Sequence, residues 1–282
     1  GTGNGADARG QGRPCPRHRP RRGPGDPARH ANLIAGRGGC RSRTGPVVSG
    51  LAGVRGGQTF RPIHATLAEM TKPAPLPSID TAERPLTVAI LLFRDVEVLD
   101  FAGPYEVFSV AARIAPRRPG QEHGPFSVVT IAETAAPVSA RHGLKVMPDH
   151  AFHDAPRCDV VIVPGGIVDE PLANPVTLDW LRRTAGQAAL TASVCTGAFI
   201  LARIGLLDGR EATTHRDDIP EMRRMFPAVR VVEGVSFVDQ GAIVTSAGIS
   251  AGIDMSLHLV ARFAGPDLAR RTARQMQYEP AR

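Results

Sequence analysis

The sequence has no uninterrupted apolar run of the ~18 residues that a membrane-spanning helix requires, so we expect no membrane partner. It has only four cysteines, at positions 15, 40, 158 and 195. Their spacing does not match that of metal ligands, and their density is far below that of a small disulfide-linked scaffold. Free thiols of this kind suit a reducing compartment, so we expect a cytoplasmic protein.

Acidic residues are scarce in the first 69 residues, which contain 12 Arg and only Asp7, Asp26 and Glu69. From Met70 onward, 22 basic residues stand against 24 acidic ones. The formal net charge of +7 therefore comes from the N-terminal segment alone. Whole-chain charge gives no argument for a nucleic-acid groove in the rest of the chain.

The N-terminal segment also lacks apolar periodicity, and such a stretch cannot bury enough surface to offset its chain entropy. We expect a disordered basic leader over 1–69, a Pro-rich linker over 70–85 and a folded domain over 86–280. The leader could be a basic arm for nucleic acid, a transit peptide, or translation from outside the natural gene with the natural start at Met70. We favour the third interpretation, because the Arg, Gly and Pro bias stops abruptly where folding signals begin.

From residue 86 onward, short apolar stretches alternate with helical segments. The expected strands are 87–93, 126–132, 159–163, 189–194, a short strand end over 212–215, 230–232 and 242–246, with a hairpin over 138–146 that turns at His142 and Gly143. The expected helices are 104–115 with Pro104 in its first turn, 175–185 capped by Asn174, one that ends at Gly205, 221–226, 250–263 and 267–278. This alternation predicts an α/β fold with a mostly parallel sheet, whose sites form at the carboxyl edge of the strands.

The sharpest chemical signal is Cys195, which lies between a strand of short β-prone residues and an apolar helix. The turn Cys195-Thr196-Gly197 is typical of a nucleophile elbow, which exposes the reactive side chain in a tight bend. A thiol at a helix N-terminus has a lowered pKa, so we expect a primed thiolate. The alternative is a small buried hydrophobic residue, as most free cysteines are.

Four more residues follow strand ends and are expected at the same edge. Asp100, in an apolar setting, is either a helix cap or a protonated acid that exchanges protons with the thiol. Gly165 and Gly166 form either a plain tight turn or an oxyanion hole of two free N–H groups. His215 is a candidate base, although a lone histidine is more often structural.

Two further groups of polar residues are better explained by structural roles. The segment 149–154, Asp-His-Ala-Phe-His-Asp, resembles a set of metal ligands, but a solvated loop explains it more simply. Asp254 and His258 have the i,i+4 spacing of a local polar pair on a helix. We therefore expect no metal site.

Taken together, several motifs resemble the ThiJ/PfpI family of the class I glutamine amidotransferase-like superfamily, over about residues 86–279. They are Leu99-Asp-Phe-Ala-Gly-Pro-Tyr-Glu-Val107, Ile162-Val-Pro-Gly-Gly166, Ser193-Val-Cys-Thr-Gly197, Leu207-Asp-Gly-Arg-Glu-Ala-Thr-Thr-His215 and Ser246-Ala-Gly-Ile-Ser-Ala-Gly-Ile-Asp254. The resemblance implies a flavodoxin-like three-layer sandwich and, as is usual in the family, a homodimer.

Within that family, Asp100, the Cys-Thr pair and the segment 274–280 look most like the isonitrile hydratase group. The resemblance implies that water is added to an isonitrile, a small-molecule substrate, to give an N-substituted formamide without any cofactor. Cys195 would attack the terminal carbon, Asp100 would move protons, and Thr196 would orient the thioimidate or the water. Gly165, Gly166 and Gly197 would bind the substrate or stabilise developing negative charge.

Other members of the family leave alternatives open. Peptidase, amidase, glyoxalase and deglycase branches usually carry Glu at the position of Asp100. The same domain also occurs in AraC-type regulators, before a helix-turn-helix module for which this sequence has no room, so we expect no nucleic-acid partner. A sensor of small molecules or oxidants is therefore the second hypothesis. Arg216 stands where both close groups are expected to have Trp, near the pocket.

Overall fold

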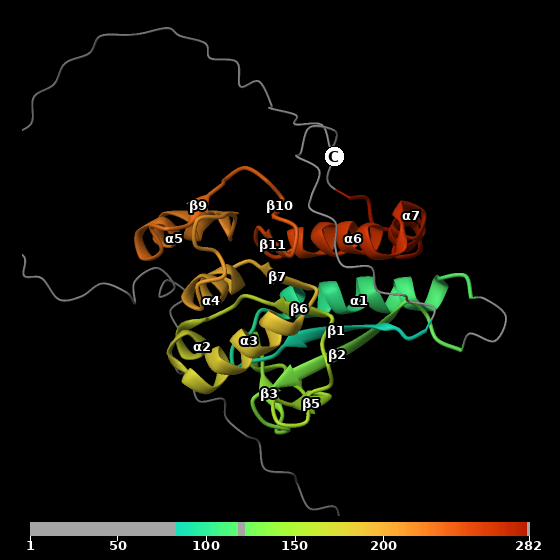
Figure 1. Ribbon diagram of the computed structural model, residues 1–282, viewed down its shortest axis with the longest axis horizontal. Helices are drawn as coiled ribbons and strands as arrows, with labels where there is room; N and C mark the ends of the chain where they lie inside the picture. The colour runs from blue at the N-terminus through green and yellow to red at the C-terminus, as the bar shows by residue number, and fades with distance from the viewer. Residues whose placement is uncertain (1–82, 118–121, 281–282) are drawn as a thin grey trace, which may run out of the picture. The chain divides into compact units, whose positions relative to one another are not determined.

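A seven-stranded sheet lies at the centre of the computed structural model, which describes residues 83–117 and 122–280 (Figure 1). The predicted leader 1–69 and almost all of the linker 70–85 lie outside the described residues. The strands follow the order β10-β11-β7-β6-β1-β2-β5, and all neighbours are parallel except β10 and β11. Their bounds are β1 Leu86–Leu91, β2 Phe126–Ala132, β5 His150–Ala151, β6 Val160–Val163, β7 Leu190–Val194, β10 Phe237–Asp239 and β11 Ile243–Ser246.

Helices cover both faces of this sheet (Figure 1). On one face α1 (Val98–Ile114), α6 (Ala251–Ala264) and α7 (Pro266–Gln275) pack against one another. The other face carries α2 (Asp169–Ala173), α3 (Pro175–Gln187) and α4 (Gly197–Arg203). The predicted α/β class with a mostly parallel sheet flanked by helices is confirmed.

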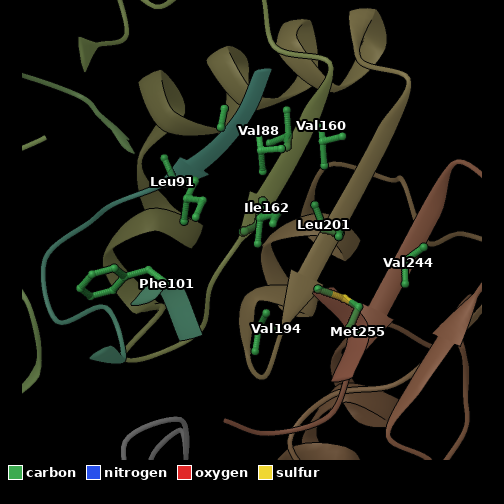
Figure 2. Close-up of a cluster of buried hydrophobic side chains, with 14 of the residues drawn as sticks. Val88, Leu91, Phe101, Val160, Ile162, Val194, Leu201, Val244 and Met255 are labelled. Carbon is green, nitrogen blue, oxygen red and sulfur yellow. The ribbon is translucent and has the colours of Figure 1, made fainter. Parts of the chain in front are cut away.

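The central strands are buried because both faces are covered, which is why they read as continuous apolar runs rather than alternating ones. Every residue of β6 and β7 is buried. Side chains from the strands meet those of the helices in one core, where Val194, Leu201 and Met255 come from three different elements (Figure 2). Strand β7 is thus held rigidly on both sides up to the residue before Cys195.

Smaller elements flank the sheet. The predicted hairpin is present, with β3 (Val138–Ser139) antiparallel to β4 (Lys145–Val146) and positive φ at His142 and Gly143. Two short parallel strands, β8 (Glu211–Ala212) and β9 (Arg230–Val231), accompany helix α5 (Ile219–Met225). No helix within 83–117 and 122–280 combines the length and apolar character needed to cross a bilayer.

Helix α1 begins six residues earlier than predicted, so Pro104 lies inside it rather than in its first turn. An internal proline removes one helical hydrogen bond and usually marks a boundary. Here the turn before it is held by burial of Phe101 and by the Gly165 N–H, which donates to Asp100 Oδ2. This correction matters for the site, because it places Asp100 in the first turn of a helix and not in a loop. Glu97, and not Asp100, occupies the N-cap position.

Candidate active site

The register of the parallel strands brings the predicted site residues to one edge of the sheet. Val163 of β6 pairs with Ser193 of β7, and Val194 pairs with Ser246 of β11. The chain segments that follow these strands therefore start at the same level. They carry Gly165, Cys195 and the loop 247–250 respectively.

Cys195 occupies a strained backbone position between β7 and α4, with φ of 56°. A non-glycine residue adopts this left-handed region only where its surroundings enforce it. The N–H of Cys195 donates to the carbonyl oxygens of Ser246 and Ala247, both at 3.2 Å. The bend between strand and helix is as sharp as predicted, but the expected exposure of the side chain is wrong: Cys195 is buried, with 7% of the residue exposed.

Two glycines make the elbow sterically feasible. A Cβ at position 197 would lie 2.1 Å from the carbonyl oxygen of Val163, which is backbone and cannot give way. A Cβ at position 165 would lie 2.6 Å from both the backbone nitrogen and the hydroxyl oxygen of Thr196, and 2.9 Å from Asp100 Oδ2. Gly165 and Gly197 thus allow the strand ends and Asp100 to approach one another closely.

Asp100 is completely buried beside the cysteine. Its Oδ2 accepts the N–H of Gly165 at 3.0 Å, and its Oδ1 has no hydrogen-bond partner among the described residues. Burial raises the pKa of this carboxyl to about 7, and the charge of Glu97 adds to the effect. The hydrogen bond from the Gly165 N–H, and to a smaller extent the neighbouring Cys195 thiol, lower this pKa. Asp100 is therefore a carboxyl that gains and loses its proton near neutral pH.

The predicted lowering of the thiol pKa is wrong. Burial, followed by the charge of Asp100, raises the pKa of Cys195 to about 12. The N–H groups of Thr196 and Ile249 favour the thiolate, as the helix N-terminus argument requires, but they do not outweigh the loss of water. The sulfur of Cys195 therefore keeps its proton at neutral pH.

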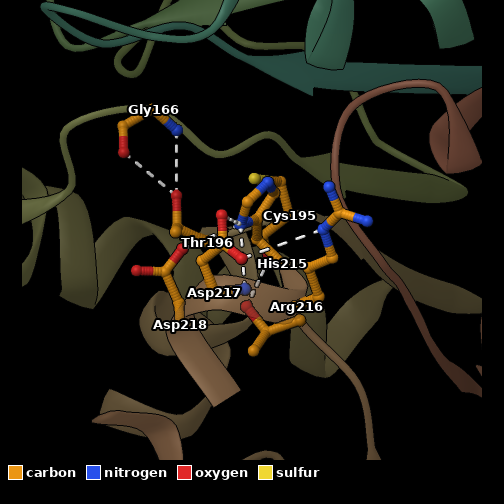
Figure 3. Close-up of polar contacts among 8 residues, drawn as sticks. Gly166, Cys195, Thr196, His215, Arg216, Asp217 and Asp218 are labelled. Carbon is orange, nitrogen blue, oxygen red and sulfur yellow. Dashed lines mark hydrogen bonds and ion pairs between the residues drawn. The ribbon is translucent and has the colours of Figure 1, made fainter. Parts of the chain in front are cut away.

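The N–H groups expected to form an oxyanion hole are already used. The Gly165 N–H donates to Asp100 Oδ2, and the Gly166 N–H donates to the Thr196 hydroxyl oxygen at 2.9 Å. The Thr196 hydroxyl in turn donates to the Gly166 carbonyl oxygen at 3.0 Å (Figure 3). Gly165 and Gly166 therefore position Asp100 and Thr196 in this structure and are not a pair of free donors.

His215 lies beside the loop that contacts Cys195. Its ring packs so closely on Gly248 that a Cβ there would be 2.0 Å from His215 Cδ2. Gly248 separates Ala247, which accepts the Cys195 N–H, from Ile249, whose N–H faces the thiol. His215 Nδ1 lies 3.3 Å from Asp218 Oδ2, so the structure brings an acidic partner to the histidine (Figure 3).

Arg216 does not enter the site. Its side chain is 88% exposed, and its Nε lies 3.8 Å from Asp217 Oδ1. The arginine at the position of the expected tryptophan therefore changes the protein surface next to His215, and not the residues that surround Cys195.

The polar residues of the segment 149–154 have structural roles. Asp149 accepts the N–H and the hydroxyl of Thr130, both at 2.8 Å, and Asp154 accepts the N–H of Ala151 at 2.7 Å. Within 83–117 and 122–280 no group of three or more metal-ligating side chains comes together.

The predicted pairing of Asp254 with His258 is wrong. Instead, His258 Nε2 lies 2.6 Å from Asp239 Oδ2, and Asp254 Oδ1 accepts the Tyr278 hydroxyl at 3.1 Å. Helical spacing brought the two residues onto one face, but partners from other elements compete for both of them.

Sequence reasoning missed three contributors to the site. These are Thr214, whose hydroxyl donates to the Cys195 carbonyl oxygen at 2.9 Å, the backbone N–H of Ile249, and Asp218 beside His215. The two threonines before His215 were part of a quoted motif and could have suggested a polar contact. Nothing in the sequence points to Ile249, whose contribution comes from its backbone.

Comparisons with known proteins find similar sequences and structures. The model of the DJ-1/PfpI family matches residues 86–262. Isonitrile hydratase from Pseudomonas putida is 36% identical over 200 residues, which are 70% of this chain and 80% of that protein. Among solved structures, a ThiJ/PfpI family protein from Pseudomonas syringae has a TM-score of 0.60 at 27% identity and covers 71% of this chain and 77% of its own.

Regulators also resemble the chain. The HTH-type transcriptional regulator GbdR from Pseudomonas aeruginosa is 30% identical over 198 residues. That match takes in 70% of this chain and 52% of the regulator, so the chain spans about half the length of this relative.

Proposed function

Because this chain belongs to the DJ-1/PfpI family, we propose that it is a cysteine-dependent hydratase that converts an isonitrile to an N-substituted formamide. Its 36% identity to an isonitrile hydratase supports the choice of reaction. The observation that carries it is the pairing of a buried thiol with a buried carboxyl whose pKa is about 7. Such a pair can move one proton between sulfur and substrate without water.

In the first step the Cys195 thiol adds to the terminal carbon of the isonitrile. The sulfur supplies the electron pair of the new S–C bond, while the thiol proton passes to Asp100. The lone pair on that carbon then takes the proton from Asp100, which gives a thioimidate. Because the isonitrile is uncharged as a whole, it loses little hydration energy on entering a buried site.

In the second step water adds across the C=N bond of the thioimidate, with hydroxide on carbon and a proton on nitrogen. The C–S bond then breaks, and the hydroxyl proton returns through Asp100 to the sulfur of Cys195. The product is the N-substituted formamide, and both residues recover their starting protonation. Asp100 is held in place for both transfers by the Gly165 N–H.

Thr196 has a narrower role in this proposal than the resemblance implies. Its hydroxyl both accepts from and donates to Gly166, so it fixes the Gly165–Gly166 turn against the elbow. It can orient water only after that contact opens. The direct way to test the function is to incubate the protein with a panel of isonitriles and 2-oxoaldehydes and to measure formamide and hydroxyacid formation.

We expect kcat/KM for an isonitrile to rise with pH, with a midpoint near 7. Below the pKa of Asp100, about 7, the carboxyl and the thiol both hold protons, and the carboxyl cannot accept the one on sulfur. Activity should therefore fall about tenfold for each pH unit below the midpoint. A stopped-assay profile between pH 5 and 9 measures this, and a flat profile would contradict the role of Asp100.

A second candidate function is the sensing of a small molecule, as a domain related to the regulators. The observation in its favour is the 30% identity to GbdR. Binding of a ligand without turnover of any isonitrile or 2-oxoaldehyde would support it. The raised pKa of Cys195, about 12, weighs against the oxidant-sensing form of this hypothesis, because oxidants react with thiolates.

His215→Ala separates the hydratase mechanism from a Cys-His mechanism of the peptidase or amidase kind. We expect partial activity to survive, because Asp100 moves the protons and His215 contacts the loop rather than the thiol proton. The measurement is kcat with the best isonitrile of the panel. Complete loss in a folded variant would favour His215, with Asp218 beside it, as the base.

A further inference from the structure

Three hydrogen-bonding groups besides the helix hold Cys195 in its left-handed conformation. Its N–H is shared by the carbonyl oxygens of Ser246 and Ala247. Its carbonyl oxygen accepts the hydroxyl of Thr214 at 2.9 Å and the N–H of Ala198 at 3.3 Å. A strained residue relaxes unless several such contacts over-determine it. The shortest of them comes from Thr214, which lies 19 residues away in the chain.

Thr214 is placed to act only on this carbonyl. The residue is completely buried, and its segment is fixed independently by Thr213, whose N–H donates to the Thr245 hydroxyl oxygen at 2.9 Å. A buried hydroxyl needs a hydrogen-bond partner, and the Cys195 carbonyl oxygen supplies it. The segment 213–215 therefore contacts the elbow through Thr214, the residue that precedes His215 in the sequence.

We propose that Thr214 is a positioning residue that keeps the Cys195 thiol aligned with the N–H groups of Thr196 and Ile249. The φ of 56° at Cys195 sets the direction of its side chain. If the carbonyl loses its hydroxyl donor, only the longer bond from the Ala198 N–H, at 3.3 Å, still holds the peptide between Cys195 and Thr196, and this peptide can then rotate. Such a rotation turns the Thr196 N–H away from the sulfur, and the thiolate loses stabilisation.

The test is the rate at which iodoacetamide alkylates Cys195 at about pH 8, measured in the folded full chain by mass spectrometry. The tryptic peptide 184–203 contains Cys195 as its single cysteine, so the other thiols do not interfere. We expect Thr214→Val to react about tenfold more slowly, because a loss of one pKa unit of thiolate stabilisation reduces the thiolate fraction tenfold. Thr214→Ser keeps the hydroxyl and should react within about twofold of the wild type.

Thr272→Val is the matched control. It removes a completely buried hydroxyl that donates to a backbone carbonyl oxygen at 2.8 Å, that of Leu268, and neither residue contacts Cys195. We expect both variants to fold and only Thr214→Val to slow alkylation. Thr214→Val reacting at the wild-type rate, or Thr272→Val slowing equally, would overturn the proposal. If Thr214→Val does not fold, Thr214→Ala makes the same comparison.

The inference rests on Cys195 as the reactive thiol of the proposed function, but alkylation needs no substrate. If slow alkylation of Thr214→Val is found in a protein that turns over no isonitrile, the positioning role stands and the hydratase function fails. With an active substrate, Thr214→Val should lower kcat and leave KM unchanged, while Thr214→Ser restores kcat.

Discussion

Replacing Cys195 by alanine is expected to abolish isonitrile turnover, and Asp100→Asn should lower kcat by about 10²- to 10⁴-fold, the range of a lost general acid–base. Asparagine is nearly isosteric and can still accept the Gly165 N–H, but it can neither take nor give the proton. The double variant should be little worse than Cys195→Ala alone, because residues that act as a unit are not additive. Steady-state formamide formation measures all three variants.

Each of the two substitutions has a matched control at another buried residue of the same type. Cys158 is a buried thiol whose Sγ donates to the Pro156 carbonyl oxygen, and Asp159 is a buried carboxyl bound by Arg84. Cys158→Ala and Asp159→Asn should keep wild-type kcat, because neither contacts the elbow. If Asp100→Asn keeps wild-type activity too, Asp100 is structural and the proposed proton transfers are wrong.

Local signals in the sequence were sufficient for most of the fold. Asn174 followed by Pro175 predicted the start of α3, where the Asn174 side chain does accept the N–H groups of Val176 and Thr177. A continuous apolar run predicted β1, and a run of short β-prone residues predicted β7, because both faces of these strands are covered. The first turn of α1 was missed because the energy that holds it comes from burial of Phe101 and from the bond between Asp100 and the Gly165 N–H, 65 residues away in the chain.

The sequence also predicted which residues meet, but not their protonation. Cys195 and Asp100 were assigned to one edge from the strand ends alone, and they do lie together. The thiol pKa was predicted from the helix N-terminus, which is a local property. Burial and the nearby carboxyl are tertiary properties, and they decide whether the thiol pKa is raised or lowered. The same reason explains why Gly165 and Gly166 were expected to have free N–H groups, since Asp100 and Thr196 reach them across the fold.

We expect the buried carboxyl of Asp100 to destabilise the fold when it is ionised, so Asp100→Asn should be more stable than the wild type above neutral pH. Burial raises the pKa of Asp100 from 3.8 to about 7. Between these values the folded protein binds a proton that the unfolded chain has lost, so the free energy of unfolding falls as the pH rises from about 4 to about 7. For this completely buried residue, a pKa shift of this size corresponds to a loss of about 4 kcal/mol, to order of magnitude, in the free energy of unfolding.

Asparagine carries no charge, so Asp100→Asn should gain about 4 kcal/mol over the wild type at pH 8 and less than about 1 kcal/mol at pH 4. Urea unfolding at the two pH values measures the difference. Asp159→Asn should show the opposite sign at pH 8. Burial acts to raise the pKa of Asp159, but the hydrogen bonds from Arg84 and Thr87 lower it overall, so its charge stabilises the fold. If the stability difference between Asp100→Asn and the wild type is the same at both pH values, the pKa of Asp100 is not raised on folding, and the carboxyl is not held for proton transfer near neutral pH.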